Sequence, residues 1–168
     1  KQYTAQADFS KAQILSPSAP ELDQIAGNSF AQYPNDQFVS ARARIQLTAL
    51  TSLLAVGSPT PEQQQQFMAA AEQGLTFANE AISADPTNPN HHAILAAIYS
   101  NLAVAGVEGA SERANTSLEE AKRLDPQNPG YYLIAAQVAA RVGDVALARS
   151  EIEEALALKG NFTEALFL

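Results

Sequence analysis

The chain has 168 residues, 46% of them apolar, and a formal net charge of −8. The negative charge argues against a general nucleic-acid binder, which needs a basic stripe to displace counterions. The absence of cysteine excludes disulfides and thiolate metal sites. Ala, Gln, Leu and Glu dominate the composition, which favours helices because these side chains lose little rotamer freedom there. The longest purely apolar run is far shorter than the roughly 20 residues of a membrane span.

The N-terminal half predicts helices that are separated by proline and glycine. Ser18 and Glu21 have the spacing of a capping box, and so do Thr60 and Gln63. Pro34 either breaks the chain between two helices or only bends one longer helix. The expected helices in this half cover Pro20–Gln32, Asp36–Val56 and Pro61–Ala84.

Two nearly identical stretches, DPTNPN from Asp85 and DPQNPG from Asp125, mark helix boundaries in the second half. In each stretch Asp-Pro ends a helix, because the residue before a proline is pushed out of the α region. The Asn is placed to cap the next helix. The second Pro falls at the first helical position, where its missing N–H costs nothing. Each stretch therefore predicts a tight turn between two helices.

The segments after the two stretches also match each other. Helices are expected over Pro89–Ala103, Ala110–Leu124, Pro129–Val142 and Val145–Leu158. The first pair is joined by the turn AVAGVEGAS and the second pair by Gly143-Asp144. The matched small residues of the second helices are Ala114 with Ala148 and Ala121 with Ala155. Small residues at helix crossings let two backbones approach closely. A fainter copy of the second helix is found near the start, over Ala5–Leu15.

This pattern resembles the tetratricopeptide repeat (TPR), a helix-turn-helix unit of about 34 residues. The unit Pro129–Phe162 fits without gaps, with Tyr132 in the family's Trp/Tyr position. Gly160 departs from the family, which usually has proline there. The preceding unit is six residues longer, and we assign the surplus to its turn. The resemblance covers Pro86–Leu168 well and Tyr3–Phe30 weakly.

The resemblance implies an all-α fold, a right-handed superhelical stack of antiparallel helix hairpins (a TPR-like solenoid). We expect one continuous solenoid with two regions. Residues 1–84 would form irregular helical repeats with two long helices. Residues 85–168 would form TPR-like repeats: one with a six-residue turn insertion, one regular and one truncated. Counting helices one by one leaves the later units out of up-down phase unless Pro34 only bends a helix.

In the TPR family the first helix of each unit lines a concave groove that binds proteins or peptides. The corresponding positions here are Asn90, Ala93, Ala97, Asn101, Leu133, Gln137 and Arg141. The Lys and Asn set with which some members hold a C-terminal carboxylate is largely missing, because Ala93 and Ala97 replace it. We therefore expect an extended peptide or a partner's helix as ligand. No cofactor, metal or catalytic residue is implied, and we do not expect an enzyme.

A narrower resemblance concerns the turn GVEGASERA, followed by the DPxNP stretch and the Gly-Asp turn. This combination looks like the soluble TPR region of bacterial O-antigen ligase or polymerase-like membrane proteins. It implies an interaction scaffold that is a soluble fragment of a larger, membrane-anchored protein, and the missing initiator Met fits that interpretation. Two alternatives remain open. The chain is an oligomerisation or spacer element, or it is an accessory domain of a glycan-assembly enzyme.

Other clusters of polar residues are interpreted as packing or surface. His91 and His92 are adjacent on a helix and point about 100° apart, so they do not converge on a metal. Arg42 and Arg44 lie two apart on a helix and cannot share a face, so we interpret them as surface charge. The carboxylates of the second helices are expected on a solvated outer face. They are Glu119, Glu120, Glu151, Glu153 and Glu154.

Overall fold

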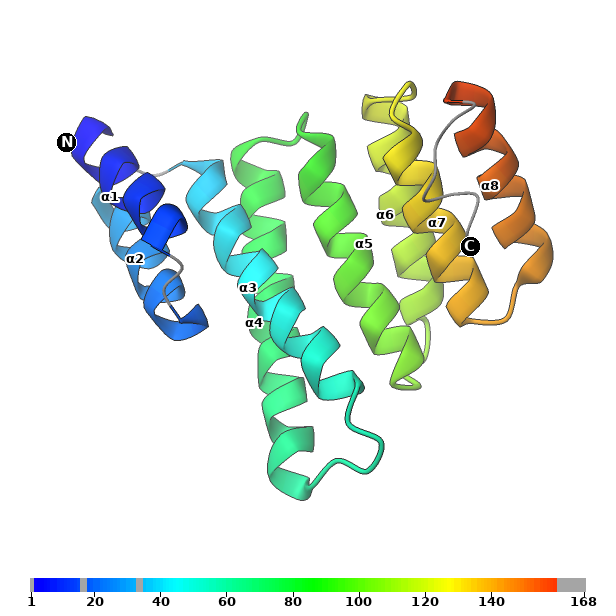
Figure 1. Cartoon of the computed structure of the whole chain (residues 1–168), viewed down its shortest axis with the longest axis horizontal. Helices are drawn as coiled ribbons and strands as arrows, with labels where there is room; N and C mark the ends of the chain where they lie inside the picture. Colours follow the sequence, from blue (N-terminus) through cyan, green and yellow to red (C-terminus); the bar gives the residue numbers. More distant parts are fainter. Residues whose placement is uncertain (1, 16–17, 33–34, 160–168) are drawn as a thin grey trace. The chain divides into compact units, whose positions relative to one another are not determined.

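The computed structural model describes residues 2–15, 18–32 and 35–159, and within these ranges every regular element is an α-helix (Figure 1). The helices are α1 (Gln2–Leu15), α2 (Ala19–Gln32), α3 (Asp36–Leu54), α4 (Pro61–Ala84), α5 (Pro89–Val104), α6 (Ala110–Leu124), α7 (Pro129–Arg141) and α8 (Val145–Leu158). The chain divides into two compact units, Lys1–Pro86 and Thr87–Leu168. None of the helices in the described ranges is both long and apolar enough to cross a membrane.

Helix α3 is separate from α2 and starts with its own cap. The Asn35 side chain accepts a hydrogen bond from the Gln37 N–H at 2.8 Å, which satisfies one of the free donors of the first turn. The sequence left open whether Pro34 separates two helices or bends one, and the structure has two helices, α2 and α3. Tyr33 and Pro34 themselves lie outside the described residues. Gly160 and the truncated third repeat also lie outside them.

Both predicted capping boxes contribute hydrogen bonds. At the start of α4 the box is complete, because the Gln63 N–H donates to Thr60 Oγ1 and the Thr60 N–H donates to Gln63 Oε1. Before α2, the Glu21 carboxylate accepts from both the N–H (2.9 Å) and the hydroxyl (2.7 Å) of Ser18. These local contacts set the starts of two helices in the N-terminal unit.

One hydrophobic cluster of the N-terminal unit joins α1, α2 and α3. The Phe9 ring of α1 meets the Phe38 ring of α3 edge to face, with 5.1 Å between centroids and 75° between planes. Ala5 and Ala26 are buried beside them. Since α3–α4, α5–α6 and α7–α8 are three successive hairpins, α1 takes the position of a first helix. The expectation that Ala5–Leu15 copies a second helix is therefore wrong.

Arg42 is only partly exposed and contacts two other helices, which corrects its interpretation as plain surface charge. Its guanidinium donates to both carboxylate oxygens of Asp23 on α2, at 2.8 and 3.4 Å. The same group lies 3.9 Å from the ring centroid of Phe77 on α4. One side chain of α3 thus contacts both neighbouring helices. Arg44 is exposed, as predicted.

The two DPxNP stretches start their helices in the same way. Asn88 accepts from the Asn90 N–H at 3.1 Å, and Asn128 accepts from the Gly130 N–H at 3.0 Å. In both cases proline occupies the first turn of the helix that follows. The predicted helix end, Asn N-cap and first-turn proline are therefore confirmed at both boundaries.

The turns inside the two C-terminal hairpins share one backbone motif. Gly143 has φ +84° and Gly106 has φ +85°, a left-handed conformation that glycine adopts without the clash of a Cβ atom. The residue after each glycine donates its N–H five residues back, from Asp144 to Ala139 O and from Val107 to Leu102 O, both at 2.9 Å. Asp144 also caps α8, because its side chain accepts from the Leu147 N–H.

The sequence analysis assigned all six extra residues of the first C-terminal hairpin to its turn. The structure places only part of them there. Helix α5 has 16 residues against 13 in α7. The turn after α5 has five residues, 105–109, against three after α7, 142–144. Helix α6 has 15 residues against 14 in α8. Half of the surplus therefore lengthens α5 by nearly one helical turn.

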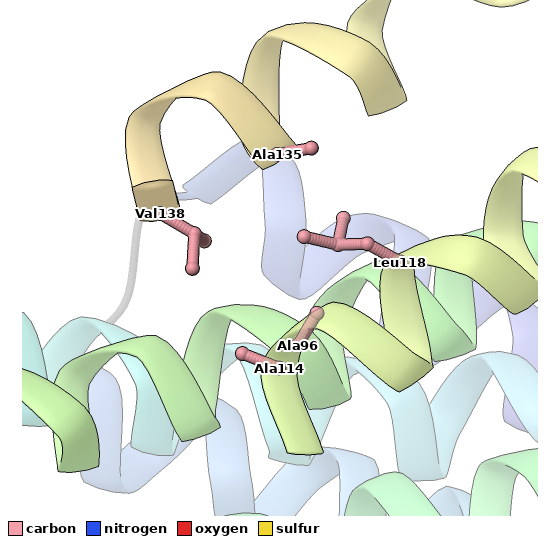
Figure 2. Close-up of a cluster of buried hydrophobic side chains, with 5 residues drawn as sticks. All are labelled: Ala96, Ala114, Leu118, Ala135 and Val138. Atoms are coloured by element: carbon pink, nitrogen blue, oxygen red, sulfur yellow. The ribbon is translucent and has the colours of Figure 1, made fainter. Parts of the chain in front are cut away.

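The core of the C-terminal unit is built from small residues around a few larger ones. Figure 2 shows Ala96 of α5, Ala114 and Leu118 of α6, and Ala135 and Val138 of α7 directed toward one another. The predicted small contact positions Ala121, Ala148 and Ala155 are also buried. Alanine at these positions lets the helices approach closely, while Leu118 fills the space that remains.

Candidate interaction surface

Helices α5 and α7, the first helices of the two C-terminal hairpins, are joined along their length. Near their N-terminal ends the Tyr131 hydroxyl donates to Asn90 Oδ1 at 3.2 Å. Near their C-terminal ends the Arg141 guanidinium donates to Asn101 Oδ1 at 3.5 Å. Two homologous helices are thereby held side by side, and each contributes residues to the predicted groove.

The seven predicted groove residues differ in their exposure. Asn90, Gln137 and Arg141 are exposed, and Ala97 is half-buried. The three buried ones are Ala93, Asn101 and Leu133. The groove as a binding site stays a prediction, and only Asn90, Gln137 and Arg141 of the set lie open to a ligand.

The buried members of this set help to pack the helices. Ala93 lies in a cluster with Ala121 of α6 and Tyr131 of α7. Leu133 lies in a cluster with Ala155 of α8. A substitution at either position would therefore disturb the fold as well as any binding.

The first helices differ from the second helices in charge. Helices α5 and α7 contain no Asp, Glu or Lys, and apart from histidine their one charged residue is Arg141. The acidic residues of the second helices are Glu112, Glu119 and Glu120 on α6 and Glu151, Glu153 and Glu154 on α8. In a chain with net charge −8, α5 and α7 therefore add no negative charge of their own to this surface.

Glu151 is not on a solvated face, which corrects the sequence interpretation. Its carboxylate accepts a 2.6 Å hydrogen bond from Lys122 Nζ of α6, and only 10% of the Lys122 side chain and 12% of the Glu151 side chain are exposed. Lys122 also donates to Glu119 at 3.0 Å and lies 5.0 Å from the ring centroid of Tyr132 on α7. Three helices meet at this ion pair. Glu153 and Glu154 are exposed, as predicted.

The charges around Lys122 decide its protonation. Burial disfavours the ammonium form, but the hydrogen bonds and the attraction of Glu151 and Glu119 outweigh that effect and raise the pKa of Lys122. The pKa of Tyr131 is raised too, first by burial and then by the nearby negative charge of Asp125. Both groups keep their protons at neutral pH, so the Tyr131 hydroxyl remains a donor to Asn90.

A shallow, open cleft of about 560 Å³ lies on the α5–α6 hairpin, and sequence reasoning did not find it. Its lining includes Leu95, Tyr99, Glu108, Glu112, Arg113 and Thr116. Arg113 donates to the Tyr99 hydroxyl at 3.3 Å and lies over the ring, 5.7 Å from its centroid. The Thr116 hydroxyl is engaged with the backbone of its own helix at 3.0 Å. The only sequence signal was the longer turn, which lengthens one end of this hairpin.

In the part of the chain that the structure describes, no group of three or more His, Asp or Glu side chains could hold a metal ion. His91 is buried in α5 and its neighbour His92 is half-buried. This agrees with the expectation that adjacent positions on a helix diverge.

Comparison with known proteins defines the fold. No model of a known protein family matches the sequence, and no curated protein is significantly similar to it. The chain is similar in structure to a thermophilic TPR protein of Thermus thermophilus, with a TM-score of 0.71 and 17% identity over 99% of this chain and 79% of that one. The predicted all-α, TPR-like helical-repeat fold is thereby confirmed. The comparisons lend no support to the narrower resemblance to O-antigen ligase-like proteins.

Proposed function

We propose that this chain is a non-catalytic scaffold that binds a protein or an extended peptide along α5 and α7. The observation that carries the proposal is the pairing of these two first helices, which leaves Asn90, Gln137 and Arg141 exposed on neighbouring elements. The TPR-like fold supports it, because helical-repeat folds use such surfaces for binding.

The exposed side chains suit a peptide backbone. The amides of Asn90 and Gln137 each offer donors and an acceptor, so they can pair with both the N–H and C=O groups of an extended chain. Arg141 adds a planar fork of five donors, one of which already bonds to Asn101. Because α5 and α7 carry no carboxylate side chain, neither helix itself repels an acidic peptide.

The test selects ligands from a display library of unstructured peptides, with the whole chain as bait, and then titrates the best peptide into isotope-labelled protein. We expect NMR shift changes to concentrate on α5 and α7. The double variant Gln137→Ala, Arg141→Ala should weaken binding at least about tenfold, which is about 1.4 kcal/mol. Shift changes confined to other helices would contradict the proposal.

Arg149→Ala provides the matched control. Arg149 lies on α8, its side chain is 83% exposed, and its ion pair with Glu153 is a loose one of 4.0 Å. Its removal also deletes one guanidinium, but from a different helix, so the affinity of the monomeric chain for the selected peptide should not change. Leu133→Ala is not a suitable test, because Leu133 packs against Ala155 and its loss would alter the fold.

We also propose, on the resemblance of the turn GVEGASERA alone, that the chain is a soluble part of a membrane-anchored protein of the O-antigen ligase kind. The full-length gene product tests this idea directly. Hydrophobic spans outside these 168 residues would support it, and their absence would contradict it. Turnover of any substrate by the 168-residue chain alone would contradict the non-catalytic assignment.

A further inference from the structure

Exposed valines concentrate at one end of the C-terminal unit. Among the described residues, five large apolar side chains are strongly exposed, and four of them are Val104, Val107, Val142 and Val145. They flank the α5–α6 and α7–α8 turns, which lie at the same end of their helices (Figure 1). A hydrogen bond of 3.5 Å from Arg141 to Asn101 joins α5 and α7 just before the two turns. We call these four valines the turn edge.

Local structure explains only one member of the turn edge. Val107 donates its N–H to Leu102 O, the arrangement in which the residue after the glycine also makes an apolar contact with the last turn of the helix. Val145 has no such role, because it is the first residue of α8 and 76% exposed. Val is also a poor helix former compared with Ala. The valines at 104, 142 and 145 therefore suggest a surface that another molecule covers.

Exposed charges of both signs lie beside the turn edge, negative at Glu108 and Asp144 and positive at Arg141 and Arg149. The α5–α6 turn carries exposed Glu108 next to Val107. Arg149 lies one helical turn after Val145, on the same face of α8, and is 83% exposed. A two-fold axis through the turn edge would place the α5–α6 turn of one copy against the α7–α8 turn of the other. Each Glu108 would then face an Arg149 of the second copy, and this would occur twice.

We propose that the turn edge is a homodimer interface in which a second copy of this chain covers the four valines and Glu108 pairs with Arg149 across the two-fold axis. Part-exposed valines supply on the order of a few hundred Å² of apolar surface per copy, less than the roughly 800 Å² per partner of a standard interface. The dimer is therefore weak and forms as the protein concentration rises. This proposal does not rest on peptide binding by α5 and α7.

The first test is sedimentation velocity of the whole chain over a wide concentration range. We expect the wild type to shift from monomer to dimer, and Val145→Asp to raise the dissociation constant at least about tenfold. Asp is well tolerated at the first position of a helix, where it meets the positive end of the helix dipole, so α8 should stay folded. Met68→Asp is the matched control, because Met68 is 58% exposed but lies on α4, and it should dimerise like the wild type.

The second test is a charge reversal, which asks whether Glu108 of one copy faces Arg149 of the other. Glu108→Arg and Arg149→Glu should each weaken the dimer, while the double variant should restore it, because the two charges exchange places across the axis. Circular dichroism of each variant checks that the helices are intact. A wild type that stays monomeric throughout, equal weakening by Met68→Asp, or no rescue by the double variant would each overturn the proposal. Binding of the monomeric chain to lipid vesicles through these valines would overturn it as well.

Discussion

Arg42 connects three helices of the N-terminal unit through one guanidinium. It pairs with both oxygens of Asp23 on α2 and stacks on Phe77 of α4. A lysine ammonium can reach the carboxylate, but it cannot make two parallel hydrogen bonds and stack at the same time. The identity of the residue at this position therefore matters more than its charge.

Arg42→Lys should lower the free energy of unfolding by about 1 kcal/mol, because it removes one hydrogen bond and most of the stacking. Urea unfolding followed by circular dichroism measures the change. Arg44→Lys is the control, since Arg44 is exposed on the same helix and its replacement should have no measurable effect. Equal stability of Arg42→Lys and the wild type would show that the three-helix contact contributes little.

Lys122 and Glu151 form a largely buried ion pair between α6 and α8. Lys122→Met would leave the Glu151 carboxylate almost buried without its partner, and we expect a loss of about 3 kcal/mol in unfolding free energy. Adding Glu151→Met should recover much of the loss, because two apolar groups leave no uncompensated charge. Thermal and urea unfolding of the single and double variants measure the coupling.

The neighbouring pair Arg123–Glu120 provides a control for this prediction. It links two side chains three residues apart on α6, with 66% of the Arg123 side chain and 38% of the Glu120 side chain exposed. Exposed pairs contribute little, so Arg123→Met should leave the unfolding midpoint unchanged within experimental error. A loss as large as that of Lys122→Met would mean that burial is not the cause.

At the scale of the element, alanines determine how closely the hairpin helices pack. Ala148 of α8 is buried, and Ala148→Leu should cost about 1–3 kcal/mol through overpacking. Ala146→Leu adds the same side chain at an exposed position of the same helix and should be nearly neutral. Differential scanning calorimetry compares the two, and equal melting temperatures would count against the proposed helix contact.

The turn between α7 and α8 depends on a left-handed backbone at Gly143, with φ +84°. Gly143→Ala should cost about 1–2 kcal/mol, since a Cβ atom in this conformation clashes with the following carbonyl. Gly57→Ala is the matched control: Gly57 has no left-handed backbone, and a Cβ atom added there would have nothing within 4 Å. It should be neutral or slightly stabilising. Chemical denaturation distinguishes the two outcomes.

Helix boundaries could be predicted from the sequence because the contacts that fix them are local. Asn88, Asn128 and Thr60 each bond to backbone within three residues of their own position, and the pattern of residue types around them is enough to find them. The lengthening of α5 was not predicted. No proline marks the end of α5, and the left-handed Gly106 that follows it is its one clear sequence signal.

At the scale of the whole molecule, the fold class was predictable and the tertiary polar contacts were not. Glu151 meets Lys122 across 29 residues of sequence, and Arg42 meets Asp23 across 19. Nothing in the local pattern distinguishes these residues from exposed Glu153 and Arg44. The same limit applies to the candidate groove, where the repeat alignment could not tell buried Leu133 from exposed neighbours.

The raised pKa of Lys122 gives the protein a stability limit on the alkaline side. A lysine with a raised pKa in the folded state stabilises the fold fully below its unfolded-state pKa, about 10.4, and this contribution is lost as pH rises through the folded-state pKa. We therefore expect wild-type stability to fall above about pH 10.4 more steeply than that of the double variant Lys122→Met, Glu151→Met. Parallel curves in urea unfolding at alkaline pH would contradict this.

The Asp-Pro stretches at Asp85 and Asp125 give the gene a simple way to change length. Each stretch contains the residues that end one helix and that cap and begin the next. Removing residues 85–124 would therefore join α4 to the complete junction that begins at Asp125. Duplication of the same segment would leave every junction equally intact. Evolution can therefore add or delete a whole hairpin here in a single recombination event, and the natural size variants of this protein should differ by whole hairpins.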